Sequence, residues 1–302
     1  MSNDLLELMN DIAEIECDVP LSTMTTLRIG GPARYVAYPD STVALDALVS
    51  LLKERKVPYK VIGKGSNLLC SDDVFDGVII RLDKFDDYYF IGNDLIAQAG
   101  CSIIALSYQA MKNGLSGLEF ASGIPASVGG VTFMNAGAYK SSMSDVIDQV
   151  FVYRDGKFEW MPRSECEFAY RKSIFQTHTD WIIIAARIHL VPKDVNEIRE
   201  LMDSRRERRM SSQPLDKPSA GSVFRNPEEV PAWKLIEGIG YRGKRIGGAM
   251  VSEKHVNFIV NEDGASARDF LSLVNEIKER VEAQYQIRLH MEVERFNWPN
   301  RK

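Results

Sequence analysis

Hydrophobic residues near the start of the chain recur at helical spacing. They fall every three or four positions from Leu5 to Ile12, which predicts an amphipathic helix over residues 4–16. Short apolar runs at 35–38 and 59–62 are predicted strands, and the segment between them again has helical spacing. The pattern therefore indicates a βαβ unit, whose second strand leads directly into a glycine-rich loop.

Turn and capping residues mark the ends of other predicted elements. Asp40 or Ser41 is expected to cap the helix of the βαβ unit, and Asp155-Gly156 is expected to form the turn of a hairpin. The remaining expected elements are, in chain order, short strands over 77–100, a helix over 102–113, a glycine-rich stretch over 114–137, a hairpin over 146–161, a strand over 182–191, a helix over 194–209, a linker over 211–222, a short helix over 231–237, a strand over 256–261, a long helix over 266–286 and a final strand over 289–296. The predicted class is α+β, with at least two domains that meet near residue 211.

The composition is that of a globular protein. Of the 302 residues, 45% are hydrophobic and 26% are charged, which excludes a disordered chain, a collagen-like fibre and a disulfide-held miniprotein as the main interpretation. The chain is long enough to bury a sizeable core. The formal net charge of −5 argues against a general polyanion binder, but it does not exclude a local basic pocket.

Neither a metal site nor a targeting segment is indicated. The four cysteines, Cys17, Cys70, Cys101 and Cys166, form no CxxC pair, so they are expected to be buried free thiols in a reducing compartment. The four histidines show no metal-ligand spacing, and no metal is expected. The N-terminus is acidic and the longest apolar run, 181–186, is too short to cross a membrane, so we expect a cytoplasmic protein.

Residues 63–67 (GKGSN) follow a predicted strand directly. Glycines allow a backbone in which several N–H groups point at one anion, and the serine and asparagine add further donors. The loop is therefore either a phosphate cradle or a tight turn at the end of the strand. It is not a dinucleotide fingerprint, because Leu68 stands where GxGxxG requires its third glycine.

A second stretch of small residues covers 123–130 (GIPASVGG) and continues at 135–138 (NAGA). Small residues let the backbone lie flat against a planar or phosphorylated ligand, although a glycine-rich loop over a core has the same composition. Two such stretches in one chain together favour one extended nucleotide ligand.

Residues 219–227 place the hydroxyl of Ser222 near Arg225 and Asn226, between small neighbours. Ser222 is either a proton donor or an ordinary capping residue. It lacks the flanking glycines of a GxSxG elbow, so a hydrolase nucleophile is poorly supported.

Two further motifs resemble nucleotide or nucleic-acid sites. Residues 238–244 match GxxxxGK, but Arg245 stands where a P-loop needs serine or threonine, and the preceding 233–237 looks helical, so a P-loop is rejected. The basic run 205–209 lies at a predicted helix C-terminus, where cations are favoured. It is a solvated helix end, a diphosphate contact or a nucleic-acid contact.

The motifs add up to a family resemblance that spans roughly residues 25–293. The matching segments are, in family order, 25–31 (TTLRIGG), 62–69 (IGKGSNLL), 123–139, 170–175 (YRKSIF), 213–227, 245–248 (RIGG), 252–261 and 289–293 (LHMEV). Each is weak alone, but the ordered set resembles the UDP-N-acetylenolpyruvoylglucosamine reductase family, also called the UDP-N-acetylmuramate dehydrogenases.

The resemblance implies an α+β flavoprotein with a FAD-binding fold of the vanillyl-alcohol-oxidase (PCMH) type and a C-terminal α+β substrate-binding domain. The expected boundaries are 1–82 and 83–210 for the two FAD-binding subdomains and 211–295 for the substrate domain, and the tail 296–302 is a candidate to rejoin the first subdomain. FAD would lie extended between the two subdomains.

The resemblance assigns FAD contacts to the two glycine-rich stretches. The expected cofactor-binding residues are Gly63, Gly65, Ser66, Asn67, Leu68, Gly123, Ile124, Pro125, Ser127, Val128 and Gly129. Neither stretch contains cysteine or histidine, so the FAD is expected to be non-covalent.

The implied reaction reduces UDP-N-acetylglucosamine enolpyruvate to UDP-N-acetylmuramate for peptidoglycan synthesis, with NADPH as co-substrate. This oxidoreductase activity serves cell-wall biogenesis, cell shape and cell division. The resemblance makes Arg171, Ser222 and Glu292 catalytic. Arg171 would grip the substrate carboxylate, Glu292 would have to carry a proton in order to donate it, and Ser222 would deliver the proton that completes the lactyl ether.

Substrate contacts are expected from Tyr170, Arg225 and Asn226, the last two at the diphosphate. Only residues 176–180 separate the Tyr-Arg motif from the next strand, so the chain resembles the shorter form of the family, which lacks the insertion that carries a substrate-binding tyrosine.

Three alternatives remain open from the sequence. One is a different flavin oxidase on the same scaffold, although the segments around Arg171 and Ser222 argue against it. The second is a colourless, non-catalytic module that binds a nucleotide sugar. The third is nucleic-acid binding through the basic run at 205–209.

Overall fold

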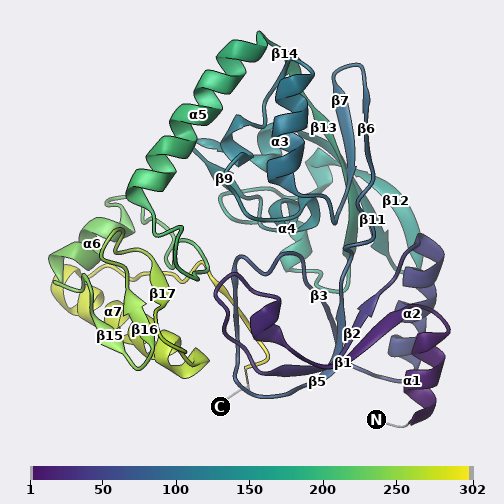
Figure 1. Cartoon of the computed structure of the whole chain (residues 1–302), viewed down its shortest axis with the longest axis horizontal. Helices are drawn as coiled ribbons and strands as arrows, with labels where there is room; N and C mark the ends of the chain where they lie inside the picture. The colour runs from purple at the N-terminus through teal and green to yellow at the C-terminus, as the bar shows by residue number, and fades with distance from the viewer. Residues whose placement is uncertain (1–2, 299–302) are drawn as a thin grey trace. The chain divides into compact units, whose positions relative to one another are not determined.

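The computed structural model describes residues 3–298, which form two compact units, and each is described by itself (Figure 1). Unit 1 runs up to Cys17, from Tyr35 to Lys64 and from Gly77 to Glu207; unit 2 comprises Asp18–Arg34, Gly65–Asp76 and the chain from Arg208 onward. The units are discontinuous, whereas the three domains expected from the sequence are consecutive, and those boundaries remain a prediction.

A five-stranded antiparallel sheet forms one half of unit 1. Its order is β12-β11-β13-β7-β6. The strands are β6 Tyr88–Ile91, β7 Asp94–Gln98, β11 Ile147–Arg154, β12 Lys157–Pro162 and β13 Ile182–His189. Asp155 and Gly156 have φ of 51° and 75° and form the two-residue turn between β11 and β12, which confirms the predicted hairpin.

Helix α4 packs against β13 and β7 of this sheet, and its hydrophobic side chains share one core with α3. The Oγ of Ser102 accepts the N–H of Ala105 at 3.4 Å and caps α3. These helices and the short elements around them are α3 Ile103–Lys112, β8 Leu115–Ser116, η2 Glu119–Ala121, α4 Val128–Phe133, β9 Gly137–Ala138, β10 Ser141–Ser142, η3 Met143–Asp145, η4 Arg163–Glu165, η5 Ile174–Gln176 and β14 Val191–Pro192.

The other half of unit 1 contains the predicted βαβ region. Its sheet has the order β1-β2-β5-β3, with β3 parallel to β5. Ser41 caps α2, because its Oγ accepts the N–H of Ala44 at 3.2 Å, as one of the two predicted alternatives requires. The elements are α1 Asn3–Asn10, β1 Glu14–Pro20, β2 Pro32–Tyr38, α2 Thr42–Glu54, β3 Tyr59–Val61 and β5 Phe75–Ile80; η1 Leu21–Thr23, which follows β1, belongs to unit 2.

Unit 2 packs helix α7 on a small antiparallel sheet of order β15-β16-β17, and helix α6 packs against α7. Helix α7 contributes a buried stripe from Phe270 through Ile277 to Val281, at the spacing that the sequence shows. The elements are β4 Leu68–Cys70, α6 Ala232–Gly238, β15 Arg245–Ile246, β16 Ala249–Val251, β17 Ile259–Asn261, α7 Ala267–Tyr285 and β18 Glu294–Phe296. Helix α5 Val195–Ser212 enters this unit from unit 1.

The final strand pairs within unit 2. Strand β18 runs parallel to β4, with Phe296 opposite Cys70, and the indole N–H of Trp298 donates to the carbonyl oxygen of Leu69 at 3.1 Å. The end of the chain thus meets residues of the first expected subdomain. Residues 299–302 of the predicted tail lie outside the described residues.

The first predicted helix was too long. Helix α1 ends at Asn10, and the segment predicted as its second half forms β1. Ile15 and Val19 are half-buried, the residues between them are exposed, and the strand pairs with β2 at the edge of the sheet. Other boundaries also moved: the linker expected at 211–222 begins with the last turn of α5, and the final strand starts at Glu294, not at 289.

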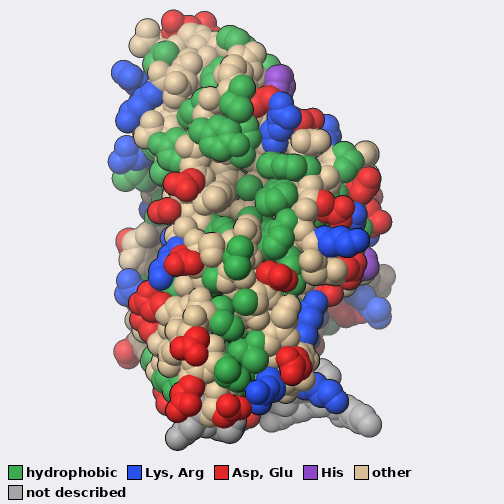
Figure 2. Space-filling model, turned by 90° about the vertical axis from the view of Figure 1, so that its right-hand side faces the viewer, with side chains coloured by type: hydrophobic (Ala, Val, Ile, Leu, Met, Phe, Trp, Pro, Cys, Tyr) green, Lys and Arg blue, Asp and Glu red, His purple; other side chains and the backbone are tan. Residues whose placement is uncertain are grey.

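Charged and hydrophobic side chains are interspersed on the face shown in Figure 2. Unit 1 exposes several large hydrophobic side chains: Tyr88, Tyr89 and Ile91 lie on β6, and the ring of Trp160 lies 5.1 Å from that of Phe151. Three cysteines are buried as predicted, but Cys17 is exposed, because it lies on β1. No helix within residues 3–298 is long and apolar enough to cross a membrane.

Candidate functional site

The loop between β3 and β4 is shaped by two close approaches of its backbone. Gly65 has φ +62°, and a Cβ there would lie 2.1 Å from the carbonyl oxygen of Met24, so only glycine fits. A Cβ at Gly63 would lie 2.6 Å from the Oγ of Ser127 and 3.9 Å from the N of Gly130. Within unit 1, the structure therefore brings the first glycine-rich stretch directly against the second.

The main-chain N–H groups of Gly63, Lys64, Gly65 and Ser66 donate no hydrogen bond to any residue in the described range 3–298. Successive N–H groups around a residue in the left-handed region form a concave donor set that binds anions. These N–H groups are therefore available to a bound anion or to water.

The N-terminus of α4 is held by the protein itself. The N–H groups of Val128 and Gly129 donate to the carbonyl oxygens of Cys101 and Ala99, both at 2.9 Å. A Cβ at Gly129 would lie 3.1 Å from the Cβ of Ala99, so the helix start lies tightly against the end of β7. Val128 and Gly129 can thus contact a cofactor only through atoms other than these N–H groups. Gly123, Ile124 and Pro125 lie in the preceding loop.

Arg171 lies at the tip of a tight turn in unit 1. Ala169 and Lys172 exchange two main-chain hydrogen bonds of 3.1 and 3.0 Å across Tyr170-Arg171, and Arg171 has φ +54°. Its guanidinium lies 5.0 Å from the centre of the Tyr170 ring, and its Nη2 donates to the carbonyl oxygen of Gly137 at 2.7 Å. Tyr170 and Arg171, both predicted site residues, are thus held side by side, and the Arg171 guanidinium is oriented by the Tyr170 ring and by the carbonyl oxygen of Gly137.

Asn135 holds this turn, and the sequence did not assign it a role. It is 2% exposed; its Nδ2 donates to the carbonyl oxygen of Ala169 at 2.9 Å and its Oδ1 accepts the N–H of Ser144 at 2.8 Å. Its φ is +41°, a conformation in which asparagine is more common than most residues. In the sequence it is an asparagine in a run of glycine and alanine, which does not by itself indicate this role.

Two further side chains join the turn to the C-terminus of α4. The Oγ of Ser173, which is fully buried, donates to the carbonyl oxygen of Phe133 at 2.6 Å. The Nε2 of Gln176 donates to the same oxygen at 3.1 Å and to the carbonyl oxygen of Arg171 at 3.2 Å. Only five residues follow η5 before β13 begins, so the chain has the short connection predicted from the sequence.

Ser222 and Glu292 lie in unit 2 on neighbouring segments. The N–H of Glu292 donates to the carbonyl oxygen of Val223 at 2.7 Å, and the two segments run antiparallel. Asn67 is bonded to the second of these segments: its Nδ2 donates to the carbonyl oxygen of Glu292 at 3.2 Å and its carbonyl oxygen accepts the N–H of Glu294 at 2.9 Å. Three predicted site residues therefore come together in this unit.

The two expected diphosphate contacts sit on the same segment of unit 2. The main-chain N–H of Arg225 donates to the carbonyl oxygen of His290 at 2.9 Å. The Oδ1 of Asn226 accepts the N–H of Ala232 at 3.1 Å, in the first turn of α6. Asn226 therefore has a structural role that the sequence did not indicate, and its amide nitrogen is the atom with which it would meet a diphosphate.

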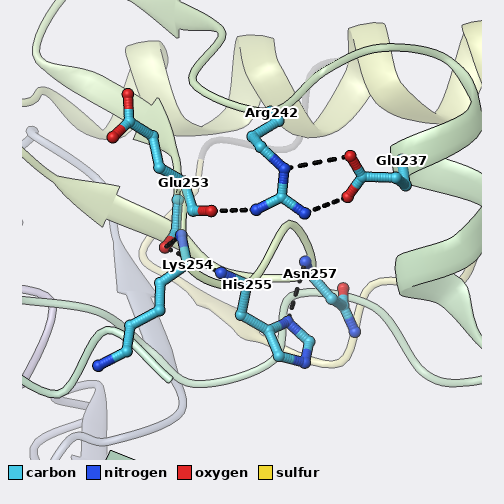
Figure 3. A network of polar contacts seen from close by, with 7 residues as sticks. Glu237, Arg242, Glu253, Lys254, His255 and Asn257 are labelled. Carbon is cyan, nitrogen blue, oxygen red and sulfur yellow. Dashed lines mark hydrogen bonds and ion pairs between the residues drawn. The ribbon is translucent and has the colours of Figure 1, made fainter. Parts of the chain in front are cut away.

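A polar network closes the loop between β16 and β17 (Figure 3). The guanidinium of Arg242 binds the carboxylate of Glu237 and the carbonyl oxygen of Glu253. The Nδ1 of His255 accepts the N–H of Asn257 at 3.2 Å. Burial lowers the pKa of His255, so its ring is neutral at neutral pH and carries its proton on Nε2.

The structure shows where two other motifs lie: the GxxxxGK match, which the sequence analysis rejected, and the basic run 205–209, which it left open. Residues 233–237 lie in α6, which confirms that no strand precedes the GxxxxGK match. In the basic run, the Arg205 guanidinium lies 4.9 Å from the centre of the Tyr139 ring, whose hydroxyl donates to the carbonyl oxygen of Arg205 at 2.9 Å. No cluster of metal-ligating side chains occurs among residues 3–298.

Family models match both parts of the chain. Residues 33–161 match the FAD binding domain, and residues 213–296 match the C-terminal domain of UDP-N-acetylenolpyruvoylglucosamine reductase. Together with the mixed α and β structure, these matches confirm the fold that the sequence predicted: a FAD-binding part followed by a substrate-domain part.

Individual proteins match over nearly their full lengths. The chain is 42% identical to UDP-N-acetylenolpyruvoylglucosamine reductase 1 of Bacillus cereus over 97% of both chains. It is 44% identical to the reductase of Carboxydothermus hydrogenoformans over 91% of both chains. Among solved structures, UDP-N-acetylenolpyruvylglucosamine reductase (MurB) from Thermus caldophilus matches with a TM-score of 0.80 and 35% identity, over 94% of this chain and 98% of that chain.

Proposed function

The chain belongs to the UDP-N-acetylenolpyruvoylglucosamine reductase family, and from this premise we propose that it reduces UDP-N-acetylglucosamine enolpyruvate to UDP-N-acetylmuramate in the cytoplasm. The observation that carries the proposal is 42% identity to such a reductase over 97% of both chains. The product feeds peptidoglycan synthesis, and through it the cell wall, cell shape and cell division.

We propose FAD as a non-covalent cofactor, with NADPH as the co-substrate. The N–H groups of residues 63–66, which donate no hydrogen bond to any of residues 3–298, fit a pyrophosphate, and Asn67, Leu68 and the stretch 123–129 supply the remaining contacts. Bound FAD would supply a carrier for a hydride, that is, for two electrons and one proton, which the protein's own side chains do not provide.

Arg171 is proposed to bind the substrate carboxylate. When a hydride reaches the methylene carbon of the enolpyruvyl group, negative charge develops on the adjacent carbon and spreads into that carboxylate. A permanent cation, already oriented by Gly137 and Tyr170, stabilises this charge without reorganising.

Ser222 and Glu292 are proposed to manage the proton. Ser222 delivers a proton to the carbon next to the ether oxygen, which completes the lactyl group. Glu292, in its protonated form, donates a hydrogen bond where charge develops. Support comes from the 2.7 Å main-chain hydrogen bond between Glu292 and Val223, which holds together the segments that carry Ser222 and Glu292.

Substrate recognition is proposed for Tyr170, Arg225 and Asn226. The aromatic ring of Tyr170 is 56% exposed and can pack on the sugar, while Arg225 and Asn226 offer N–H donors to the diphosphate. A cation and an amide on one segment are suited to two neighbouring phosphate groups.

The proposal is tested by incubating the protein with NADPH and the enolpyruvyl nucleotide without oxygen. Beyond the one equivalent that reduces the bound flavin, NADPH should be oxidised only when the nucleotide is present, and the product should gain two hydrogen atoms by mass spectrometry. A flavin oxidase would instead consume oxygen without the nucleotide, and a binding module would oxidise no NADPH.

A further inference from the structure

The segment that follows Ser222 is held from one side by residues 290–292. Two main-chain hydrogen bonds, of 2.7 and 2.9 Å, join 223–225 to this segment. Phe224 lies between those two bonds, opposite Met291. In an antiparallel pair, a residue in this position directs its own N–H and C=O to the other side, where they need different partners.

Asn257 supplies those partners. Its Oδ1 accepts the N–H of Phe224 at 3.0 Å, and its Nδ2 donates to the carbonyl oxygen of Phe224 at 2.9 Å. Its main-chain carbonyl oxygen also accepts the N–H of Val223 at 2.8 Å. Asn257 is 4% exposed and Phe224 is 1% exposed, so these bonds are sheltered from water. The side chain thus takes the place of a neighbouring strand.

The loop that carries Asn257 is itself fixed at both ends of its turn. The N–H of Asn257 donates to the Nδ1 of His255, and Arg242 joins the carbonyl oxygen of Glu253 to the carboxylate of Glu237 on α6 (Figure 3). Because this loop is fixed, the Asn257 carboxamide also fixes the backbone beside Ser222, to which it is hydrogen-bonded at Phe224.

We infer that Asn257 is the positioning residue for Ser222: it fixes the backbone that holds the serine hydroxyl where the proton must be delivered. This inference rests on the proposed role of Ser222 as proton donor. Residue type matters here, because only a side chain with one donor and one acceptor satisfies both groups of Phe224. Removing it leaves both groups unpaired and free to shift, and a displacement of about 1 Å can cost about 100-fold in rate.

The first test uses Asn257→Ala in the full-length, FAD-loaded protein. Reoxidation of the reduced flavin by the enolpyruvyl nucleotide should slow roughly 100-fold, while reduction by NADPH stays within about twofold. The solvent deuterium isotope effect on reoxidation should rise, because proton delivery becomes the slow step. An unchanged isotope effect, or equal slowing of both steps, overturns the inference.

A double mutant separates positioning from general destabilisation. In a Ser222→Ala background, Asn257→Ala should slow reoxidation by less than about twofold more, because the group it positions is gone. The matched control is Asn261→Ala: its carboxamide makes three hydrogen bonds to the main chain of unit 2, to Leu27, Arg28 and Ala265, where that of Asn257 makes two, both to Phe224. Its effect should multiply with that of Ser222→Ala; multiplicative behaviour of Asn257→Ala would contradict the inference.

Asn257→Asp offers a conservative rescue. A protonated carboxyl group has one O–H donor and one acceptor and can restore both bonds to Phe224, whereas the carboxylate has acceptors only. The reoxidation rate of this variant, relative to the native protein, should therefore rise as the pH falls, and Asn257→Leu should show no such rise. A pH-independent deficit of the aspartate variant counts against the inference.

Amide hydrogen exchange provides a readout that needs no enzymatic activity. In Asn257→Ala, the amides of Val223 and Phe224 should exchange at least tenfold faster than in the native protein, while those of β16 keep their rates. Unchanged exchange at Phe224 overturns the inference whatever the reaction of the protein is. Faster exchange in a protein that does not reduce the enolpyruvyl nucleotide would instead refute the proposed function.

Discussion

The guanidinium of Arg171 donates a hydrogen bond to the carbonyl oxygen of Gly137 at 2.7 Å. Arg171 has φ +54°, in the left-handed region, and Gly137 lies on β9, where a Cβ would lie 2.2 Å from the carbonyl oxygen of Ser141. Strained conformations persist where the surrounding structure fixes them, and they concentrate at functional sites. The bond orients a cation before any substrate arrives.

Arg171→Lys should therefore be a severe change although it keeps the charge. Lysine cannot present two parallel N–H groups to a carboxylate, nor stack on Tyr170 as a planar group. We expect reoxidation by the enolpyruvyl nucleotide to slow by about 100-fold, roughly the loss of one charge-stabilising donor set. Stopped-flow absorbance of the flavin measures it, and reduction by NADPH serves as the internal control. A rate within threefold of the native protein would remove Arg171 from the mechanism.

Ser222→Ala tests the proton donor. Flavin reduction by NADPH should stay near normal, because no proton from Ser222 is needed there. Reoxidation by the enolpyruvyl nucleotide should slow by about 100-fold or more, as expected for the loss of a general acid. Rapid-mixing spectroscopy resolves the two steps. Equal slowing of both steps would show that Ser222 supports the structure and does not donate the proton.

Gly63→Ala should disturb the contact between the two glycine-rich stretches. The added methyl group would lie 2.6 Å from the Oγ of Ser127, and overpacking of this kind typically costs about 1–3 kcal/mol. Urea unfolding of the protein measures the loss. Ser127→Gly in the same chain should recover most of it, because it removes the atom in the way. If the double variant is no more stable than Gly63→Ala, the two stretches are not in contact as described.

Asp269 should make stability depend on pH at the start of α7. The N–H of Ser266, the Oγ of Ser266 and the N–H of Gly248 lower the pKa of this carboxyl below its ordinary 3.8. A lowered pKa in the folded state favours the carboxylate, so its contribution is complete above about pH 4 and is lost as the pH falls through the folded value.

Asp269→Asn tests this pH dependence. Denaturant unfolding across pH should show the variant less stable by about 1 kcal/mol at neutral pH, with a difference that shrinks below pH 3.8. The capping serine stays in place in this variant, so the comparison isolates the carboxylate. A difference that is constant across the acid range would contradict the assigned cause.

Local signals predicted the elements whose ends are set by their own side chains. Ser41 caps α2, Ser266 and Asp269 form a capping box at α7, and Asp155-Gly156 turns the hairpin, all as short-range chemistry requires. Strand β1 was not predicted, because its pairing with β2 cannot be read from the local sequence of β1. Tertiary pairing overrode the helical spacing that precedes it.

The residues of the candidate site fall into the same two groups: those whose type is set locally and those that act through segments distant in sequence. Glycines at 63 and 65 could be identified from sequence, because their type is dictated by close approach of the backbone. Asn135 and Asn257 could not, because each acts through main-chain groups far away in sequence, at Ala169 and at Phe224. The proposed roles of the catalytic residues came from the ordered family motifs, since no local pattern distinguishes a catalytic serine from a cap.

The most direct measurement mixes the purified protein with NADPH and then with the enolpyruvyl nucleotide in the absence of oxygen, while the visible spectrum is recorded. We predict a yellow protein that bleaches with NADPH and regains its colour within seconds of adding the nucleotide, with one nucleotide reduced per flavin. A colourless protein, or a bleached one that regains its colour only when oxygen is admitted, would contradict the proposed function.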